Sequence, residues 1–202
     1  MSRYAIPKHR VRVEIGVSNS RFIATIAPVL TVKEAQAFVR EMRAEMPNAT
    51  HHVYAFRIGY GASVSEGMSD DGEPSGTSGP PTLAVLRGAD VGDVVIVTTR
   101  YFGGTKLGTG GLVSAYTAAA HAAFEALETE EKVIRIAMEC TIPYRILERV
   151  RQLLARCECV QVEEQFGPEI ALRFLAPEEC IDALVGGMHD LTNGTVTPRV
   201  VA

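Results

Sequence analysis

The segment that decides the fold is DVVIVTTRYFGGTKLGTGGL, residues 93–112. Its first part is a continuous run of β-branched residues, which is typical of a strand buried on both faces. A glycine-rich loop that contains Lys106 comes next. Apolar residues then recur every three or four positions, at Leu112, Tyr116, Ala119, Ala123 and Leu127. This spacing predicts a long helix that begins directly at the loop.

Upstream of this segment, strand and helix patterns alternate. Residues 10–26 alternate polar and apolar residues on either side of a short polar break, which predicts a hairpin. Thr31 is followed three residues later by Glu34, as in a capping box, and apolar residues at helical spacing follow. Residues 50–60 show the alternation of a strand. Residues 61–79 are too polar to pack in a core, and they predict a long loop with a function.

Beyond residue 132 the pattern restarts and covers the rest of the chain. It predicts, in order, strand 133–142, helix 144–156, strand 158–165, strand 169–175, helix 177–191 and strand 195–201. Each of the two helices has a single apolar face, which suits packing on one side of an antiparallel sheet. This βαββαβ order is that of a ferredoxin-like domain. The sequence therefore predicts an α+β protein of two domains, residues 1–129 and residues 130–202.

Length and composition agree with two globular domains. The 202 residues of the chain exceed the usual domain size of roughly 100 to 150 residues. The 47% hydrophobic and 22% charged residues exclude a disordered chain. No stretch approaches the roughly 20 apolar residues of a membrane span, and the first residues do not resemble a secretion signal. The four cysteines match neither a disulfide framework nor a zinc site, so we expect reduced thiols in a cytoplasmic protein.

The net charge is unevenly distributed along the sequence. Residues 1–129 contain 12 Lys and Arg and 12 Asp and Glu, whereas residues 130–202 contain 8 and 12, which accounts for the formal charge of −4. Binding of a polyanion requires a local excess of cations. Any contact with nucleic acid is therefore expected from a local patch.

The first of two candidate functional loops, residues 69–81, has two sets of polar side chains: the carboxylates of Asp70, Asp71 and Glu73, and the hydroxyls of Ser75 and Thr77. The carboxylates can order the loop or bind a hard cation such as Mg²⁺. The hydroxyls and free backbone N–H groups can hold an anion. In the structural alternative, glycine and proline form tight turns and the polar side chains bind the backbone of the loop itself. The residues alone leave both readings open.

The second loop, residues 100–111, is the better candidate for an anion-binding site. It lies between a predicted strand and the N-terminus of a predicted helix, where unpaired N–H groups and the helix dipole favour a phosphate. Arg100 and Lys106 add positive charge. The loop has neither the GxxxxGK[ST] order of a P-loop nor the Rossmann fingerprint, so nucleotide binding by these two routes is excluded. The structural alternative is that the glycines only allow close packing.

The sequence identifies no catalytic residue. The cysteines lie in the second domain, and no serine stands in a Gly-x-Ser-x-Gly elbow. His51 and His52 begin a predicted strand, where a hydrogen-bonded histidine is commoner than a catalytic one. The sequence therefore favours a binding protein over an enzyme, and it predicts neither a firm metal site nor a cofactor.

Together, the two loops resemble the signature of the YigZ/Impact family. The matching segments are Ser20–Ala24, Ala49–His51, Asp70–Gly79 and Arg100–Leu112. The resemblance spans most of residues 15–120. It implies a two-layer βαβ first domain of the type found in ribosomal proteins and in domain IV of elongation factor G. It also implies a second domain like that of the bacterial YigZ branch and like the final domain of the same factor.

The resemblance implies contact with RNA or the ribosome, and eukaryotic relatives act in translational control through a protein partner. The residues then expected on one anion-facing surface are Arg21, His51, Arg100, Lys106 and Thr109. One alternative is a Mg²⁺-dependent protein that acts on a phosphorylated or nucleotide ligand, because galactokinase-like kinases share this fold. Another is a protein–protein regulator without an anion site. The sequence does not determine the oligomeric state.

Two positions depart from the family pattern. The family usually has an arginine within Gly-Gly-Leu-x-Arg-Ala-Tyr where this chain has Ser114, and a cysteine after the first histidine where this chain has Val53. Loss of the arginine weakens the expected anion-binding surface. Loss of the cysteine argues that no thiol chemistry is required there.

Overall fold

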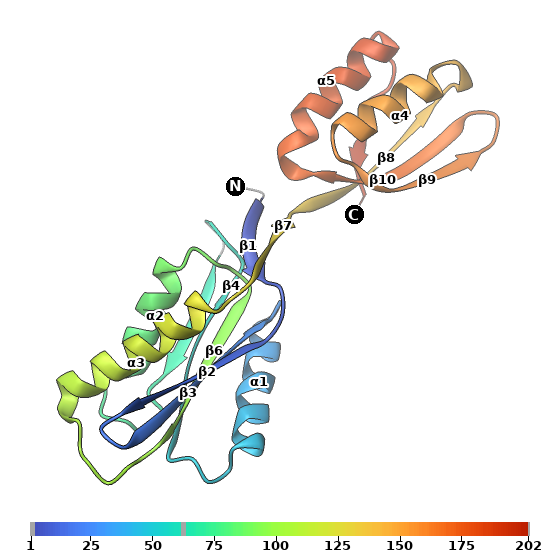
Figure 1. Cartoon of the computed structure of the whole chain (residues 1–202). Coiled ribbons are helices and arrows are strands. Elements are labelled where there is room, and N and C mark those ends of the chain that lie inside the picture. Colours follow the sequence, from blue (N-terminus) through green and yellow to red (C-terminus); the bar gives the residue numbers. More distant parts are fainter. Residues whose placement is uncertain (1–2, 62–63, 202) are drawn as a thin grey trace. The chain divides into compact units, whose positions relative to one another are not determined.

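The computed structural model describes residues 3–61 and 64–201 (Figure 1). The chain forms two compact domains, Tyr4–Lys132 and Val133–Ala202, and Arg3 belongs to the second. The division falls after Lys132, whereas the sequence placed it after residue 129. Lys132 belongs to the first domain because its ammonium group pairs with the buried carboxylate of Asp93.

The first domain is built on a five-stranded antiparallel sheet with the strand order β2-β3-β6-β4-β5. Its strands are β2 (Val11–Val17), β3 (Ser20–Pro28), β4 (His51–Ile58), β5 (Ser65–Ser69) and β6 (Val94–Tyr101). The predicted β-branched strand is β6, which lies at the centre of the sheet and is buried along nearly its whole length. The predicted hairpin is formed by β2 and β3. Both predictions are confirmed.

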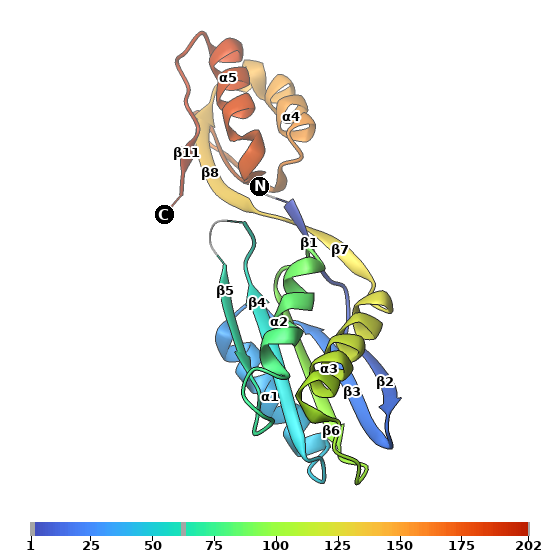
Figure 2. The ribbon, with the colours of Figure 1, turned by 90° about the vertical axis from the view of Figure 1, so that its left-hand side faces the viewer.

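Helices cover both faces of this sheet (Figure 2). α1 (Val32–Glu45) packs on one face, and α2 (Gly79–Gly88) and α3 (Gly108–Glu125) pack on the other. β6 supplies apolar side chains to both cores, for example Val95 to the α1 side and Ile96 to the α2–α3 side. A strand whose two faces are both apolar needs cover on both sides. The domain therefore has three layers and not the two that we expected.

The N-terminus of α1 follows the predicted capping box. The hydroxyl oxygen of Thr31 accepts a hydrogen bond from the Glu34 N–H at 3.1 Å, and the Glu34 carboxylate accepts one from the Leu30 N–H at 2.8 Å. These bonds satisfy two backbone donors near the start of the helix. This prediction is confirmed.

β5 lies at the edge of the sheet, within the segment that the sequence predicts as a loop. Its residues, SEGMS, have no strand-like pattern. Gly67 lies against the ring of Phe56 on β4, and a Cβ atom at this glycine would come within 2.3 Å of the ring. Pairing with β4 and this close packing therefore define the strand, which its own side chains do not predict.

β1 (Arg3–Pro7) and β7 (Thr129–Val133), which the sequence did not predict, form a separate two-stranded sheet. Asp93 connects both strands to the start of β6. Its carboxylate accepts a hydrogen bond from the Tyr4 hydroxyl at 2.8 Å and pairs with Lys132. Burial raises the pKa of the Asp93 carboxyl, but its hydrogen bonds outweigh burial and leave the pKa below its ordinary value.

The second domain has the predicted ferredoxin-like topology. Its elements are β8 (Arg135–Ile142), α4 (Leu147–Arg156), β9 (Val160–Phe166), β10 (Ile170–Pro177), α5 (Ile181–Thr192) and β11 (Arg199–Val200). Short 3-10 turns, Tyr144–Ile146 and Glu178–Cys180, precede the two helices. The strand order is β11-β8-β10-β9, and the helices share one core with the sheet. No helix in the described part of the chain is long and apolar enough to cross a membrane.

Candidate functional site

The two candidate loops lie beside each other at one end of the first-domain sheet (Figure 2). We call residues 70–78, between β5 and α2, the acidic loop. We call residues 102–111, which lead from β6 into the first turn of α3, the glycine loop. Glu73 of the acidic loop accepts hydrogen bonds from Arg100 at the end of β6 and from Tyr116 on α3. These bonds hold the acidic loop against the strand and the helix that flank the glycine loop.

Asp70 ties the two ends of the acidic loop together. One carboxylate oxygen accepts hydrogen bonds from the Ser78 N–H at 3.0 Å, the Ser78 hydroxyl at 2.7 Å and the Gly79 N–H at 2.8 Å. The other accepts one from the Gly76 N–H at 2.9 Å. Burial raises the pKa of the Asp70 carboxyl, but these bonds outweigh it and leave the pKa below its ordinary value. Asp70 is therefore an internal acceptor that shapes the loop.

Asp71 binds the loop to β4 and α1. Its carboxylate pairs with the Arg43 guanidinium and accepts a hydrogen bond from the His52 N–H at 2.6 Å. Its backbone carbonyl oxygen lies 2.8 Å from Nδ1 of His51. The backbone φ of Asp71 is +44°, in the left-handed region that short polar residues tolerate. The contacts of Asp71 thus keep the loop in an uncommon backbone conformation.

Glu73 forms a buried ion pair beneath the loop. Its side chain is 3% exposed, and one carboxylate oxygen accepts hydrogen bonds from Nη1 of Arg100 and from the Tyr116 hydroxyl, each at 2.7 Å. Nε2 of His51 lies 3.9 Å from the other oxygen. Burial and the bond to Glu73 raise the pKa of Tyr116 far above its ordinary value. Tyr116 is therefore a neutral hydrogen-bond donor.

The three carboxylates of the acidic loop point to three separate sets of protein partners. Asp70 binds the backbone of its own loop, Asp71 binds α1 and β4, and Glu73 binds β6 and α3. Among residues 3–61 and 64–201, no group of three His, Cys, Asp or Glu side chains is arranged to hold a metal ion. The geometry supports a loop-ordering role for these carboxylates more than a shared cation site.

Arg100 does not lie on the surface where we expected it. Its side chain is 6% exposed and its anionic partner is Glu73. The guanidinium carbon lies 5.3 Å from the ring centre of Phe22 and 5.5 Å from that of Phe102, so aromatic rings also contact the cation. Arg100 is buried because it pairs with Phe22 of β3 and so lies on the sheet face that α2 and α3 cover. Arg100 is thus part of the support of the two loops.

Arg21 is exposed, but it lies on the other face of the sheet. In β3 it is adjacent to Phe22, which pairs with Arg100, and neighbouring residues of a strand point to opposite faces. Its guanidinium pairs with Glu14 at 2.7 Å and lies over the ring of Tyr101, with 5.3 Å to the ring centre. Arg21 and Arg100 therefore do not share the single anion-facing surface that we expected.

His51 and Thr77 also have internal partners. The side chain of His51 is 19% exposed and lies between Asp71 and Glu73. Thr77 is buried, and its hydroxyl donates a hydrogen bond to the Pro74 carbonyl oxygen at 2.7 Å. Both residues stabilise the acidic loop from within, which corrects the expectation that they face an anion.

Besides Arg21, three of the predicted anion-facing residues are exposed: Ser75 of the acidic loop and Lys106 and Thr109 of the glycine loop. Within the described residues, no side chain caps the N-terminus of α3 and no acidic residue lies in its first turn. The N–H groups of that turn therefore present the positive end of the helix dipole. Gly76 of the acidic loop and Val113 of α3 line the same open cavity. We call Ser75, Lys106, Thr109 and the first turn of α3 the helix-start surface.

The glycines of this region have different structural roles. A Cβ atom at Gly103 would lie 2.0 Å from the carbonyl oxygen of Asn19, so glycine is required where the β2–β3 turn packs against the loop. Gly104 and Gly108 have φ values of +87° and +70°, in the left-handed region that favours glycine. Gly110 has neither a close neighbour nor a positive φ. Packing therefore explains Gly103 but not Gly110.

Comparison with known proteins places this site in a family. The family model described as the Impact N-terminal domain matches residues 18–124, more than half of the chain and the part that contains both loops. The chain belongs to the IMPACT family. The resemblance inferred from the loop sequences is thus confirmed.

Relatives in the IMPACT family match either nearly the whole chain or about half of it. The IMPACT family member YigZ of Escherichia coli is 35% identical over 197 residues, which are 97% of each chain. A crystal structure described as that of a hypothetical protein has a TM-score of 0.72 and 34% identity, and covers 100% of this chain and 98% of its own. Protein IMPACT of Xenopus laevis is 31% identical over 98 residues, 46% of this chain and 31% of that protein. The match to the bacterial relative therefore includes the ferredoxin-like domain.

The two departures from the IMPACT family pattern have different surroundings. Val53 is completely buried in the α2–α3 core of the first domain, so it serves packing. Ser114 is exposed on α3, one turn after Gly110. An arginine at position 114 would add positive charge close to the helix-start surface, whereas this chain has Lys106 as the cation there.

The sequence alone did not identify Tyr116 or Arg43 as parts of the site. Tyr116 stands in the apolar stripe of α3 and was assigned to the core, which is correct for its ring. Its hydroxyl could have indicated a role in the site, because a buried tyrosine usually needs a hydrogen-bond partner. Arg43 gave no signal, since its partner Asp71 is distant in sequence and only the fold brings them together.

Proposed function

We propose that this IMPACT family protein is a non-enzymatic, cytoplasmic regulator of translation that binds RNA, alone or on the ribosome, through the helix-start surface. One observation carries the proposal. The start of α3 presents uncapped N–H groups beside the exposed side chains of Lys106 and Thr109, while the carboxylates of the neighbouring acidic loop are bound by protein groups. N–H groups at a helix N-terminus with a nearby lysine are suited to a phosphate.

Family membership supports the same assignment. Protein IMPACT of Xenopus laevis matches 46% of this chain, and the family resemblance implies a role in translational control. The formal charge of −4 does not oppose RNA binding, because the acidic excess lies in residues 130–202. Contact through a local surface of the first domain is consistent with this distribution.

The test is binding of the full chain to purified ribosomes and to a short single-stranded RNA across a salt series. Phosphate contacts make affinity fall with salt, and we expect Lys106→Ala to lower the slope of log affinity against log salt by about 1. Lys33→Ala is the matched control, since Lys33 is an exposed lysine on α1, on the opposite face of the sheet. Absence of binding at low salt, or equal effects of the two substitutions, would refute the proposal.

Arg100→Ala is not a suitable test of anion binding. Its guanidinium is paired with Glu73 in the interior, so its removal would disturb the fold of both loops. The exposed hydroxyl of Thr109 is the better second position. We expect Thr109→Ala to weaken RNA binding less than Lys106→Ala, because a neutral hydrogen bond contributes less than a charged one.

A Mg²⁺-dependent protein that acts on a nucleotide remains an alternative at the same loops. It receives less support, because Asp70, Asp71 and Glu73 do not converge on one position. A panel of nucleotides with and without Mg²⁺ tests it directly. Cation-dependent binding of ATP that Asp70→Asn abolishes would favour this alternative over RNA binding.

A protein partner is the second candidate, and one observation favours it. α2 and α3 border an open cavity of about 920 Å³ whose lining is mainly apolar, including Pro81, Ala84, Val113 and Phe124. Val113 is 38% exposed there. A partner that binds this cavity would lose affinity on Val113→Arg and keep it on Lys106→Ala. An RNA contact at the helix-start surface predicts the reverse.

A further inference from the structure

β9 forms an unpaired edge of the second-domain sheet. It is the last strand in the order β11-β8-β10-β9, and no other described strand pairs with its outer side. Six of its seven residues are exposed. In an antiparallel pair, the peptide groups of alternate residues face the partner and the others face away. The outer edge of β9 therefore presents backbone donors and acceptors to an added strand.

A regular part of this edge adjoins an exposed aromatic pair. The register of β9 with β10 is continuous from Glu163 to Phe166, and an irregularity lies before it, where Gln161 has a φ of +52°. Phe166 is 59% exposed and Tyr144 is 52% exposed, and their ring centres are 6.3 Å apart. The Tyr144 hydroxyl donates a hydrogen bond to the Gly167 carbonyl oxygen at 2.7 Å. This bond already restricts the Tyr144 ring, so little conformational entropy would be lost when an apolar ligand packs on it.

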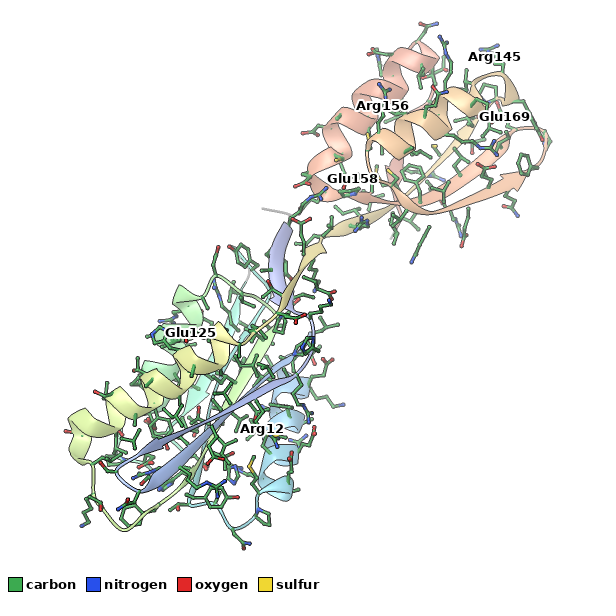
Figure 3. All side chains as sticks on the ribbon, viewed as in Figure 1. Arg12, Glu125, Arg145, Arg156, Glu158 and Glu169 are labelled. Carbon is green, nitrogen blue, oxygen red and sulfur yellow. The ribbon has the colours of Figure 1, made fainter. Side chains whose placement is uncertain are left out.

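The same edge is acidic. Between Arg156 and Arg173 the sequence has no Lys or Arg, and it has the four glutamates Glu158, Glu163, Glu164 and Glu169. Two of them are neutralised, because Glu158 pairs with Arg3 and Glu164 with Arg151. Glu163 on β9 and Glu169 at the β9–β10 turn are exposed, and Figure 3 labels Glu169. Arg173 of β10 lies opposite Glu163, but its guanidinium pairs with Glu139 at 3.3 Å. The charges of Glu163 and Glu169 therefore favour a cationic ligand and oppose an anionic one.

The charge pattern also favours a different protein over a second copy of this chain. A second copy of β9 in parallel register would place Glu163 beside Glu163 and Glu164 beside Glu164. An antiparallel pair centred on Glu163 would again place that residue opposite itself. Like charges directly opposite each other destabilise a strand pair. The partner strand is therefore expected to carry basic residues.

We propose that the outer edge of β9 binds an extended segment of a partner protein as an added strand, and that this segment alternates basic and apolar residues. Glu163 and Glu169 pair with its lysines or arginines, and an apolar side chain packs on Phe166 and Tyr144. Backbone hydrogen bonds supply affinity in such strand addition, and side chains supply specificity. The proposal concerns the second domain and does not depend on RNA binding by the first.

The probe is a fluorescein-labelled peptide of alternating Val and Lys, with a peptide of alternating Val and Glu as its charge-reversed match. Fluorescence anisotropy with the full chain measures affinity, and amide hydrogen exchange locates the contact. We expect the Lys peptide to bind at least about tenfold more tightly than the Glu peptide. We also expect it to slow the exchange of amides in β9. Equal binding of both peptides, or protection elsewhere only, would overturn the proposal.

Two pairs of variants test the named side chains. Glu163→Lys with Glu169→Lys is expected to weaken binding of the Lys peptide about tenfold, whereas Asp182→Lys with Asp190→Lys, an equal charge change on exposed positions of α5, leaves it nearly unchanged. Phe166→Ala is expected to weaken binding, and Val200→Ala is its control. Val200 is 60% exposed on β11, at the opposite edge of the sheet.

The outcomes of these variants are decisive because all six substituted positions are exposed, so the fold tolerates their change. Equal loss in test and control variants would overturn the proposal. Sedimentation of the free chain gives a further check. A dimer that Phe166→Ala dissociates would show that β9 pairs with a second copy, and that result would also overturn the proposal.

Discussion

The acidic loop and the glycine loop are similar in sequence and opposite in structure. Both are polar and rich in glycine, and both looked like ligand-binding loops. In the acidic loop, the carboxylates of Asp70, Asp71 and Glu73 are all bound by protein groups. In the glycine loop, Lys106 and Thr109 are exposed at a helix N-terminus that no described side chain caps. Charged side chains in a loop thus indicate a ligand site only when the fold leaves them without internal partners.

Glu73→Ala is the strongest test of this comparison. It leaves the Arg100 guanidinium buried without its carboxylate, which is expected to lower the free energy of unfolding by about 3–5 kcal/mol. Urea unfolding measures the loss. Ser75→Ala, in the same loop but exposed, is the control and should change stability by less than about 0.5 kcal/mol. Similar values for the two variants would contradict the internal role of Glu73.

Asp70→Ala tests whether one carboxylate shapes the acidic loop. The substitution removes the acceptor for the N–H groups of Gly76, Ser78 and Gly79. Because these are hydrogen bonds to a charged group, we expect a loss of about 2–3 kcal/mol in unfolding free energy. Amide hydrogen exchange of these three residues should become faster. Unchanged exchange would mean that the loop keeps its conformation without Asp70.

Two glycine substitutions sharpen the comparison inside the glycine loop. Gly103→Ala would place a Cβ atom 2.0 Å from the Asn19 carbonyl oxygen. We expect this clash to lower the free energy of unfolding by about 1–3 kcal/mol. Gly110→Ala meets no neighbouring atom, and alanine in a helix should stabilise the domain by about 0.5 kcal/mol or more. If RNA contacts the first turn of α3, Gly110→Ala weakens binding without loss of stability. An equal effect of both substitutions on stability would show that packing dictates both glycines.

The smallest expected effect is the dependence of folding stability on pH that the Asp70 carboxylate contributes. The folded pKa of Asp70 lies below its ordinary value, so its charge stabilises the fold above about pH 4, and this contribution is lost as pH falls through the folded pKa. Asp70→Asn removes the charge at every pH. The stability difference between wild type and Asp70→Asn, from urea unfolding between about pH 7 and pH 2, should therefore shrink at low pH. A constant difference would show that the Asp70 charge is not linked to folding.

Local patterns were sufficient for much of the fold. The β-branched run of β6, the capping box of α1 and the βαββαβ order of the second domain were each predicted from residues close in sequence. The two strands β1 and β7 and the edge strand β5 were not predicted. Their sequences lack strand patterns, and they form because partner strands lie beside them. The family resemblance implied a two-layer first domain, which would leave one apolar face of β6 exposed. The structure instead has helices on both faces of the sheet, so that both apolar faces of β6 are buried.

The candidate site was likewise predicted only in part. The two loops, and Lys106 and Thr109 at the start of α3, were located by glycine content and by the strand–loop–helix order alone. Burial of Arg100 and Glu73 was not predictable, because they pair with each other, and Glu73 with Tyr116, across distant parts of the sequence. Arg21 was assigned to the wrong face because its register with Arg100 depends on the pairing of β3 with β6.

The sequence by itself determined most of the helices and strands, the two-domain α+β organisation, the family and the location of both loops, because periodicity, capping and glycine content act over a few residues. Only the tertiary structure decided which polar groups remain available to a ligand. An ion pair such as Glu73–Arg100 joins residues from different elements, and its formation depends on sheet register and burial. The same composition therefore becomes structural support in one loop and an exposed surface in the other.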